Sequence, residues 1–268
     1  MRVHFRKRSS ITWLGAAFAV LALCGATAQA QPFIVGNSGA FGNGPIVTYN
    51  FATGATVNSF VPTGAQTGLN NGRGVLARIV ANRIYYTELE GVTGFDPTPV
   101  IHVAPYNGGA GGADITTWPT PRPGVGIQDI AYHNGLVYVL TGDPFSSPQL
   151  FLLNPTTGAK IFGPVNIAAP ASGDSDGMAV LTNGNVLINR SLGSCTYDQY
   201  SWTTGAQVIG TITVPKSTYC TGADFDGTNL YFMTDGVNIT QTTTAGVLVV
   251  QRTVALNSVK DISIAFNF

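Results

Sequence analysis

Four aspartates are the residues of this chain whose type and placement suggest chemistry, because each lies near the beginning of a short apolar segment: Asp129, Asp174, Asp176 and Asp261. Carboxylates that face one another raise each other's pKa or recruit a cation. If the four side chains meet, they form one of two kinds of site. One is a site for a divalent cation such as Ca²⁺, with Asp129, Asp174 and Asp176 as ligands, and the other is a carboxylate pair for acid and base catalysis.

A structural role for these aspartates is the alternative, and it is the interpretation that we favour. Aspartates at strand starts often cap turns or accept hydrogen bonds from nearby backbone, which here means the backbone of the next repeat. The two glutamates, Glu88 and Glu90, fall in a different segment, and none of the three histidines is placed to complete a site. The sequence therefore assigns no catalytic residue, and the four aspartates remain candidates only.

Cys195 and Cys220 are the only cysteines after the first 30 residues. They fall in two loops that we expect on the same face of neighbouring repeats. No Cys-x-x-Cys spacing or nearby histidine indicates a metal or redox site. In an oxidising compartment, this placement predicts a disulfide.

Aromatic residues in predicted loops form a third group with a functional interpretation. Aromatic side chains on the face of a repeat protein stack on sugars or hold peptides. Tyr106 belongs to this group, and the predicted ligand-binding residues within it are Trp118, Tyr197, Tyr200, Trp202 and Tyr219. A second aromatic group recurs at matching strand positions and predicts packing between repeats: Tyr85, Tyr86, Tyr138 and Tyr231.

The elements that must position these residues form a repeat of two apolar runs joined by a tight turn. The repeat is clearest in Gly126–Leu140, Asp176–Asn189 and Gly222–Met233. Asn-Gly or Asp-Gly between the two runs predicts a β-hairpin. Self-similarity at a period of roughly 40–50 residues indicates a β-propeller.

Each repeat divides into four strands, which we call A to D from the inside of the ring to the outside. A glycine closes the predicted C–D turn at Gly54, Gly158, Gly205 and Gly246, where a left-handed backbone is needed. The interval between the first two glycines spans two repeats, so the missing turn falls within Pro105–Ala113. The expected blades 2 to 5 then cover residues 73–120, 125–168, 172–215 and 217–256.

The first blade is split between the two ends of the chain. Residues 31–61 supply only strands B, C and D, and Asp261–Phe266 supplies a single A strand. The sequence therefore predicts an all-β, five-bladed β-propeller over residues 31–268, closed by pairing of the C-terminal A strand with the N-terminal three. Because all A strands run the same way along the axis, residues at their starts are expected to converge on one mouth of the central channel.

Two segments resemble the repeats of known propellers: Asp176–Ala179 followed by Asn183–Leu187, and Asn154–Gly158. They are similar to the repeats of the NHL, quinoprotein-like and gluconolactonase-like superfamilies. The resemblance implies a propeller fold over the whole chain after the leader. In gluconolactonase-like propellers, the channel mouth holds a divalent metal, and in five-bladed glycosidases inner-strand carboxylates supply the acid and the base.

The first 30 residues have the pattern of a cleaved export signal. Arg2, Arg6, Lys7 and Arg8 precede an apolar run, and Ala28-Gln29-Ala30 is a small-x-small cleavage site. Four of the 13 basic residues lie in this segment, which leaves nine against 13 acidic residues and a formal net charge of −4. This balance argues against a nucleic-acid partner, which calls for a basic face. No later segment is long and apolar enough to predict a membrane span.

Together these features predict a secreted or periplasmic propeller, expected to be a monomer, that binds an unidentified protein or glycan or serves as a scaffold. A metal-dependent hydrolase, directed at a lactone or a glycan and using the acidic channel mouth, is one alternative. An inert structural surface protein is the other. The fold does not decide among them, because propellers host unrelated functions.

Overall fold

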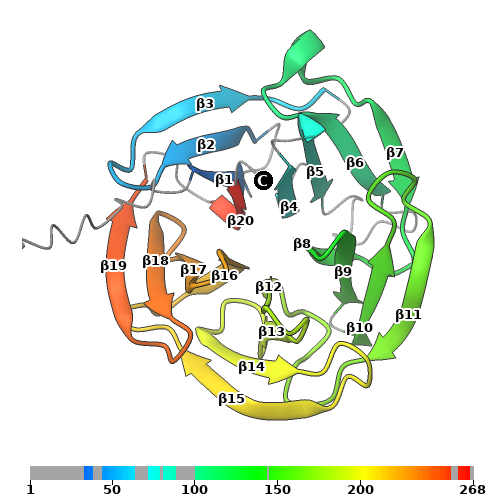
Figure 1. Ribbon diagram of the computed structural model, residues 1–268, viewed down its shortest axis with the longest axis vertical. Helices are drawn as coiled ribbons and strands as arrows, with labels where there is room; N and C mark the ends of the chain where they lie inside the picture. The colour runs from blue at the N-terminus through cyan, green and yellow to red at the C-terminus, as the bar shows by residue number, and fades with distance from the viewer. Residues whose placement is uncertain are drawn as a thin grey trace, which may run out of the picture. The chain divides into compact units, whose positions relative to one another are not determined.

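Twenty β-strands form five four-stranded antiparallel sheets arranged around a central axis (Figure 1). The computed structural model describes residues 33–38, 44–63, 72–78, 81–88, 100–143, 145–254 and 259–265. All of them belong to one compact unit, Gln31–Phe268. The predicted export signal lies outside the described residues. Among those residues, no helix has the length and apolar character needed to cross a membrane.

Blades 2 to 5 follow one another along the chain, each with its strands in sequential order from the axis outward. Blade 2 consists of β4 (Gly72–Arg78), β5 (Arg83–Glu88), β6 (Val100–Pro105) and β7 (Thr116–Pro119). Blade 3 consists of β8 (Ile127–His133), β9 (Leu136–Asp143), β10 (Ser146–Leu153) and β11 (Lys160–Asn166). Blade 4 consists of β12 (Met178–Val180), β13 (Val186–Asn189), β14 (Thr196–Tyr200) and β15 (Gln207–Thr213). Blade 5 consists of β16 (Cys220–Phe225), β17 (Asn229–Thr234), β18 (Asn238–Thr243) and β19 (Leu248–Thr253).

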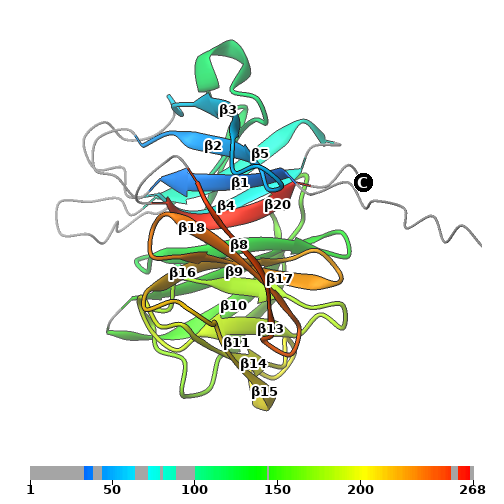
Figure 2. The ribbon, with the colours of Figure 1, turned by 90° about the vertical axis from the view of Figure 1, so that its left-hand side faces the viewer.

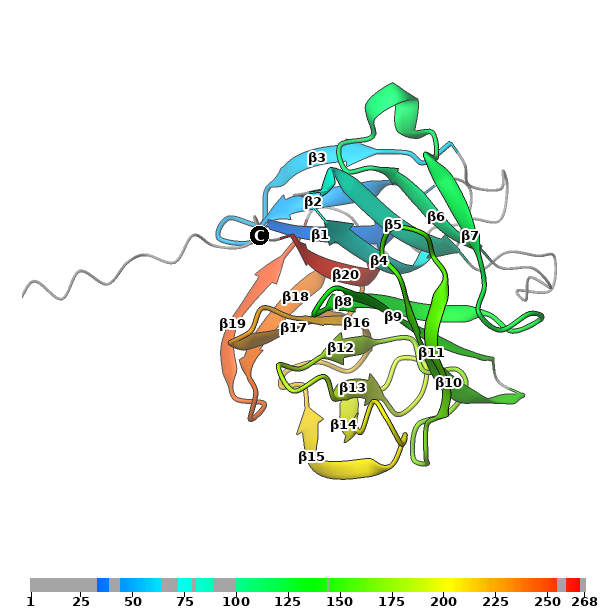
Figure 3. The ribbon, with the colours of Figure 1, turned by 45° about the vertical axis from the view of Figure 1, so that its right-hand side comes forward.

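Blade 1 closes the ring from both ends of the chain, as predicted. Its strand order is β20-β1-β2-β3, with the bounds β20 (Val259–Ala265), β1 (Phe33–Ser38), β2 (Ile46–Asn50) and β3 (Thr56–Phe60). β20 and β1 are antiparallel, with Phe33 opposite Ala265 and Val35 opposite Ser263. Figures 2 and 3 show β20 in red beside β1 in blue from two further directions. The predicted five-bladed fold is confirmed.

The predicted C–D turn glycines adopt the left-handed backbone that the turn requires. Gly54, Gly158, Gly205 and Gly246 have φ angles of 72°, 69°, 69° and 80°. Blade 2 carries a Gly-rich loop instead, which contains the short 3-10 helix η2 (Gly109–Gly112). This loop contacts blade 1, because the Gly108 Cα approaches the Phe60 ring so closely that a Cβ would lie 2.5 Å from it. The substitution of a loop for the turn within Pro105–Ala113 is therefore also confirmed.

Five apolar cores lie between neighbouring blades and hold the ring together. The core between blades 2 and 3, for example, joins Tyr85 and Trp118 to Phe151. The Tyr85 hydroxyl also donates a hydrogen bond of 2.9 Å across this boundary to the backbone carbonyl of Pro155. Each aromatic of the predicted packing group is buried, with an exposed fraction of 3% or less: Tyr85, Tyr86, Tyr138 and Tyr231.

Candidate functional site

The main candidate site is a cavity of about 410 Å³ on the axis of the ring, at the end of the A strands. We call it the axial cavity. All five blades contribute to its wall, and the contributing residues come from the last residues of the A strands or from the turns that follow them. Its lining residues are Leu76, Ala77, Arg78, Tyr132, His133, Asn134, Val180, Thr182, Asp224, Phe225, Asp226, Gly227, Ser263 and Ile264.

Arg78 and Tyr132 form a cation–aromatic pair in the wall of the axial cavity. The guanidinium carbon of Arg78 lies 4.3 Å from the centre of the Tyr132 ring. Tyr132 is 37% exposed although it lies in an inner strand. Arg78 has no carboxylate partner or hydrogen bond among the described residues. The pair therefore presents a stacked guanidinium with unused donors to the cavity.

Two carboxylates of blade 5 also line the cavity, but their oxygens are engaged by the protein. The Asp224 carboxylate accepts hydrogen bonds of 2.7 Å from the backbone N–H groups of Phe225 and Ile264. Burial raises the pKa of Asp224 to about 6, against the effect of these bonds. The Asp226 carboxylate accepts bonds from the N–H groups of Thr228 and Asn229 and from the Tyr231 hydroxyl. Asp226 is thus a turn residue, as its Asp-Gly sequence predicts.

The opposite end of the channel holds two of the predicted aspartates, Asp129 and Asp261, which are both 1% exposed. The Asp129 Oδ2 accepts a hydrogen bond of 2.5 Å from the N–H of Met178 in blade 4. The Asp261 Oδ2 accepts one of 2.6 Å from the N–H of Val75 in blade 2. Each aspartate thus ties its A strand to that of the next blade. This is the structural role that we favoured from the sequence.

Asp129 and Asp261 are both buried, and each influences the pKa of the other. Burial raises the pKa of Asp129, and the nearby charge of Asp261 raises it further. The pKa of Asp261 is likewise raised, mainly by burial. Two carboxyl groups that lie near each other share a proton more easily than they carry two charges. The structure therefore places two buried carboxyl groups, one from blade 1 and one from blade 3, at this end of the channel.

Asp176 and Asp174 have separate surroundings. Asp176 is buried, accepts a hydrogen bond of 2.8 Å from the Asn189 side chain, and lies 3.7 Å from a guanidinium nitrogen of Arg73. Asp174, in the loop before β12, accepts a hydrogen bond from the Ser172 hydroxyl. Within the described part of the chain, no group of three or more histidine, cysteine, aspartate or glutamate side chains is arranged to hold a metal ion.

The predicted ligand-binding aromatics are divided between the interior and the surface. Tyr197, Tyr200 and Trp118 lie in strands rather than loops and are at most 3% exposed, so their rings pack between blades instead of facing a ligand. Tyr219 is 37% exposed and accepts a hydrogen bond of 3.0 Å from the Lys260 amine. Trp202 lies in a C–D turn, where its ring contacts that of Phe162 edge to face at 5.7 Å. Tyr219 and Trp202 alone keep the predicted surface position.

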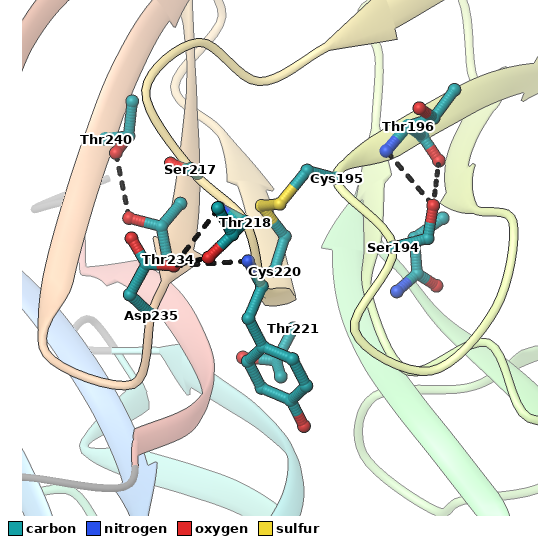
Figure 4. The surroundings of a disulfide bond; sticks show 12 residues. Ser194, Cys195, Thr196, Ser217, Thr218, Cys220, Thr221, Thr234, Asp235 and Thr240 are labelled. Atoms are coloured by element: carbon teal, nitrogen blue, oxygen red, sulfur yellow. Dashed lines mark hydrogen bonds between the residues drawn. A yellow bond between two sulfur atoms is a disulfide. The ribbon is translucent and has the colours of Figure 1, made fainter.

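The predicted disulfide between Cys195 and Cys220 is present (Figure 4). It links the loop before β14 in blade 4 to the first residue of β16 in blade 5. The backbone N–H of Cys220 also donates a hydrogen bond of 3.0 Å to the Gly193 carbonyl, across the same boundary. Nearby, the Asp235 carboxylate accepts hydrogen bonds from the backbone N–H and the hydroxyl of Thr218. The disulfide therefore links the start of blade 5 covalently to blade 4.

The predicted aspartates lie at the starts of the A strands, whereas the axial cavity lies at the ends of these strands. Arg78 and Tyr132 were not predicted as site residues, because the candidates at the inner strands were the acidic residues at the strand starts. A signal was present in the sequence: Tyr132 directly precedes the His133-Asn134-Gly135 turn, and Arg78 ends the corresponding apolar run of blade 2. Residues beside equivalent A–B turns must meet at one end of the ring.

Comparisons with known proteins support the fold and nothing finer. No protein-family model matches the chain, and no curated protein matches it. A solved protein of unknown function from Bacteroides caccae is similar, with a TM-score of 0.56 and 13% identity over 87% of this chain and 99% of that one. A chain of a nidogen/laminin complex is similar, with a TM-score of 0.53 and 11% identity over 87% and 98%. The resemblance to the NHL, quinoprotein-like and gluconolactonase-like superfamilies has no family match behind it.

Proposed function

We propose that this protein is a secreted or periplasmic binding module whose ligand enters the axial cavity. The observation that carries the proposal is the Arg78–Tyr132 pair, an exposed aromatic ring and an unpaired guanidinium in a concave site. Ligand sites in proteins are typically concave and largely apolar, with a few polar groups that fix orientation. The cavity has this composition, since Leu76, Val180 and Ile264 adjoin the polar pair.

The aspartates support binding rather than catalysis. A general acid or a metal ligand needs an oxygen that is free to reach the reacting group. The Oδ2 atoms of Asp129 and Asp261 accept backbone N–H groups of neighbouring blades, and Asp224 does the same at the other end of the channel. The Oδ1 atom of Asp261 and the Oδ2 atom of Asp176 are buried and accept no hydrogen bond from the described residues. These two oxygens are buried, at most 3% exposed by residue, whereas the Arg78–Tyr132 pair lines an open cavity, and we therefore prefer the binding module to the hydrolase.

An extracytoplasmic location is part of the same proposal. Disulfides persist in oxidising compartments and are rare in the reducing cytosol. The Cys195–Cys220 bond accords with such a compartment. The basic, apolar and small-residue pattern of residues 1–30 accords with export by a cleaved signal.

The test compares two tyrosines of equal exposure at opposite ends of the channel, Tyr132 and Tyr219, each 37% exposed. The purified protein is screened against glycan, peptide and small-molecule panels, and each hit is measured again with Tyr132→Ala and Tyr219→Ala. We expect binding to be lost in Tyr132→Ala and kept in Tyr219→Ala. The reverse result would place the ligand on the face that carries the disulfide. A panel without a hit, or hits that neither variant affects, would refute the axial cavity as the binding site and favour the inert scaffold.

A further inference from the structure

Among the residues that the structure describes, Arg78 is the only lysine or arginine that lines the axial cavity. Its guanidinium is held in place by the Tyr132 ring at 4.3 Å rather than by a carboxylate. A guanidinium offers five N–H donors in a planar fork, and the group that matches this fork is a carboxylate or a phosphate. Stacking on an aromatic face fixes the plane of the fork before a ligand arrives. The cavity therefore contains a preorganised hydrogen-bond donor group, the Arg78 guanidinium, for an anionic ligand.

The neighbouring acidic residues favour a singly charged anion over a doubly charged one. Asp224 and Asp226 line the same cavity, and their negative charges oppose any anion in proportion to its charge. Their oxygens accept backbone N–H and tyrosine hydroxyl bonds, so they do not occupy the fork of Arg78. A phosphate would also need more donors than one side chain supplies, as at the helix N-termini and glycine-rich loops that usually bind it.

The remaining wall fits the body of a small organic molecule. Leu76, Val180 and Ile264 are each at most 5% exposed and give the cavity an aliphatic surface. Phe225 and the open part of the Tyr132 ring add aromatic surface. A volume of about 410 Å³ suits one small molecule or one terminal unit of a larger ligand.

Resting on the proposed function, we infer that the ligand of the axial cavity presents a carboxylate to Arg78 and lays its body against this aliphatic and aromatic wall. The ligand is thus a compact organic acid, either free or as the terminal unit of a larger molecule. Arg78 selects the charge, and Tyr132 both orients Arg78 and contacts the ligand.

The experiment uses matched pairs of probes that differ in the charged group: glucuronate with glucose for a sugar body, and benzoate with benzamide for an aromatic one. Affinities are measured by calorimetry or by chemical-shift titration on the wild-type protein. We expect the acid of at least one pair to bind at least about tenfold more tightly than its neutral partner, because bonds to charged groups are the strong ones. The pair that shows the difference identifies the body that the cavity accepts.

Three variants test whether Arg78 causes the preference for the acid over the neutral probe. Arg78→Gln should abolish the difference between acid and neutral probe, and Arg78→Lys should keep the charge but weaken the preference, because the ammonium lacks the fork. Arg252→Gln removes a guanidinium from the exposed outer strand β19 and should change nothing. Thermal unfolding of each variant separates loss of the site from loss of the fold.

Two results would overturn the inference while leaving the binding module intact. One is equal binding of acid and neutral probes, or a preference that Arg78→Gln does not alter. The other is failure of both acids to bind while another ligand binds in a manner that depends on Tyr132. If no ligand of any kind depends on Tyr132, the proposed function itself fails, and the inference fails with it.

Discussion

Removal of the Cys195–Cys220 bond tests how blade 5 is fastened to the ring. The two cysteines are 25 residues apart, and a bond across a loop of this length stabilises the fold by about 3.5 kcal/mol in the chain-entropy model. Unfolding entropy of about 2.1 cal/mol/K per residue gives ~0.5 kcal/mol/K for residues 31–268, so this loss lowers Tm by about 7 °C. The hydrogen bond between the Cys220 N–H and the Gly193 carbonyl should survive, because it does not involve the sulfur atoms.

The assay is thermal unfolding followed by circular dichroism on Cys195→Ala and on the double variant Cys195→Ala/Cys220→Ala. The single variant keeps the fully buried sulfur of Cys220 and loses only the sulfur of Cys195, which is partly buried, so most of the packing is retained. The double variant should unfold at the same or a slightly lower temperature. A fall of less than about 2 °C in Cys195→Ala would refute the reasoning. So would two reactive thiols per mature wild-type chain in denaturant without reductant.

Three further predictions concern the inner strands. Deletion of Val259–Phe268 should abolish the folded monomer, because it removes β20 and exposes the paired edge of β1; a sharp thermal transition in the truncated protein would contradict this. Gly222→Ala should lower the free energy of unfolding by at least about 1–3 kcal/mol, because the new Cβ would lie 2.5 Å from the Cα of Asp261. Denaturant titration measures this loss, and Gly109→Ala, whose Cβ would have no contact shorter than 3.3 Å, is the control that should change the free energy little. Burial raises the pKa of Asp224 to about 6 in the folded protein, so the folded state binds this proton more tightly than the unfolded chain does. The resulting stabilisation is lost as the pH rises through about 6, and lowering the pH from 7.5 to 5 should therefore raise Tm. In Asp224→Asn the rise should be smaller, and an unchanged pH slope would exclude this carboxyl as its source.

The sequence was a good guide to the fold because propeller blades are built from local signals. Glycines such as Gly158 and Gly205 mark turns whose left-handed backbone other residues adopt at a cost. Alternate apolar residues set the strands, and the lone strand around Asp261 has only one partner that would complete a blade. These signals act within one hairpin or between hairpins that share a sheet edge. They therefore define the count and the closure of the ring.

The site was harder to predict because it depends on how one blade meets the next. Tyr197 and Trp118 were taken for loop aromatics, and their burial follows from the neighbouring blade, which covers them. The aspartates were placed in the correct part of the channel, but which atoms they contact depends on the pairing register. In the A strands that carry Asp129 and Asp261 the register shifts beside these residues, between Ile127 and Asp129 in β8 and between Val259 and Asp261 in β20. A β-bulge re-aims the side chain beside it, and alternation along a sequence does not reveal one.

Two features occur together where neighbouring inner strands meet: an aspartate that accepts a backbone N–H of the next blade, and a glycine directly before that N–H. Asp129 and Asp261 each bridge to a backbone N–H of the next blade, at residues that directly follow Gly177 and Gly74. The glycines occur where the next strand is too close for a side chain: a Cβ on Gly74 would lie 2.7 Å from the Ile130 nitrogen. Gly74 also belongs to the blade that separates the two aspartates. The Oδ2 atoms of both aspartates thus accept backbone N–H groups at this end of the channel, whereas Arg78 and Tyr132 line the axial cavity at the opposite end.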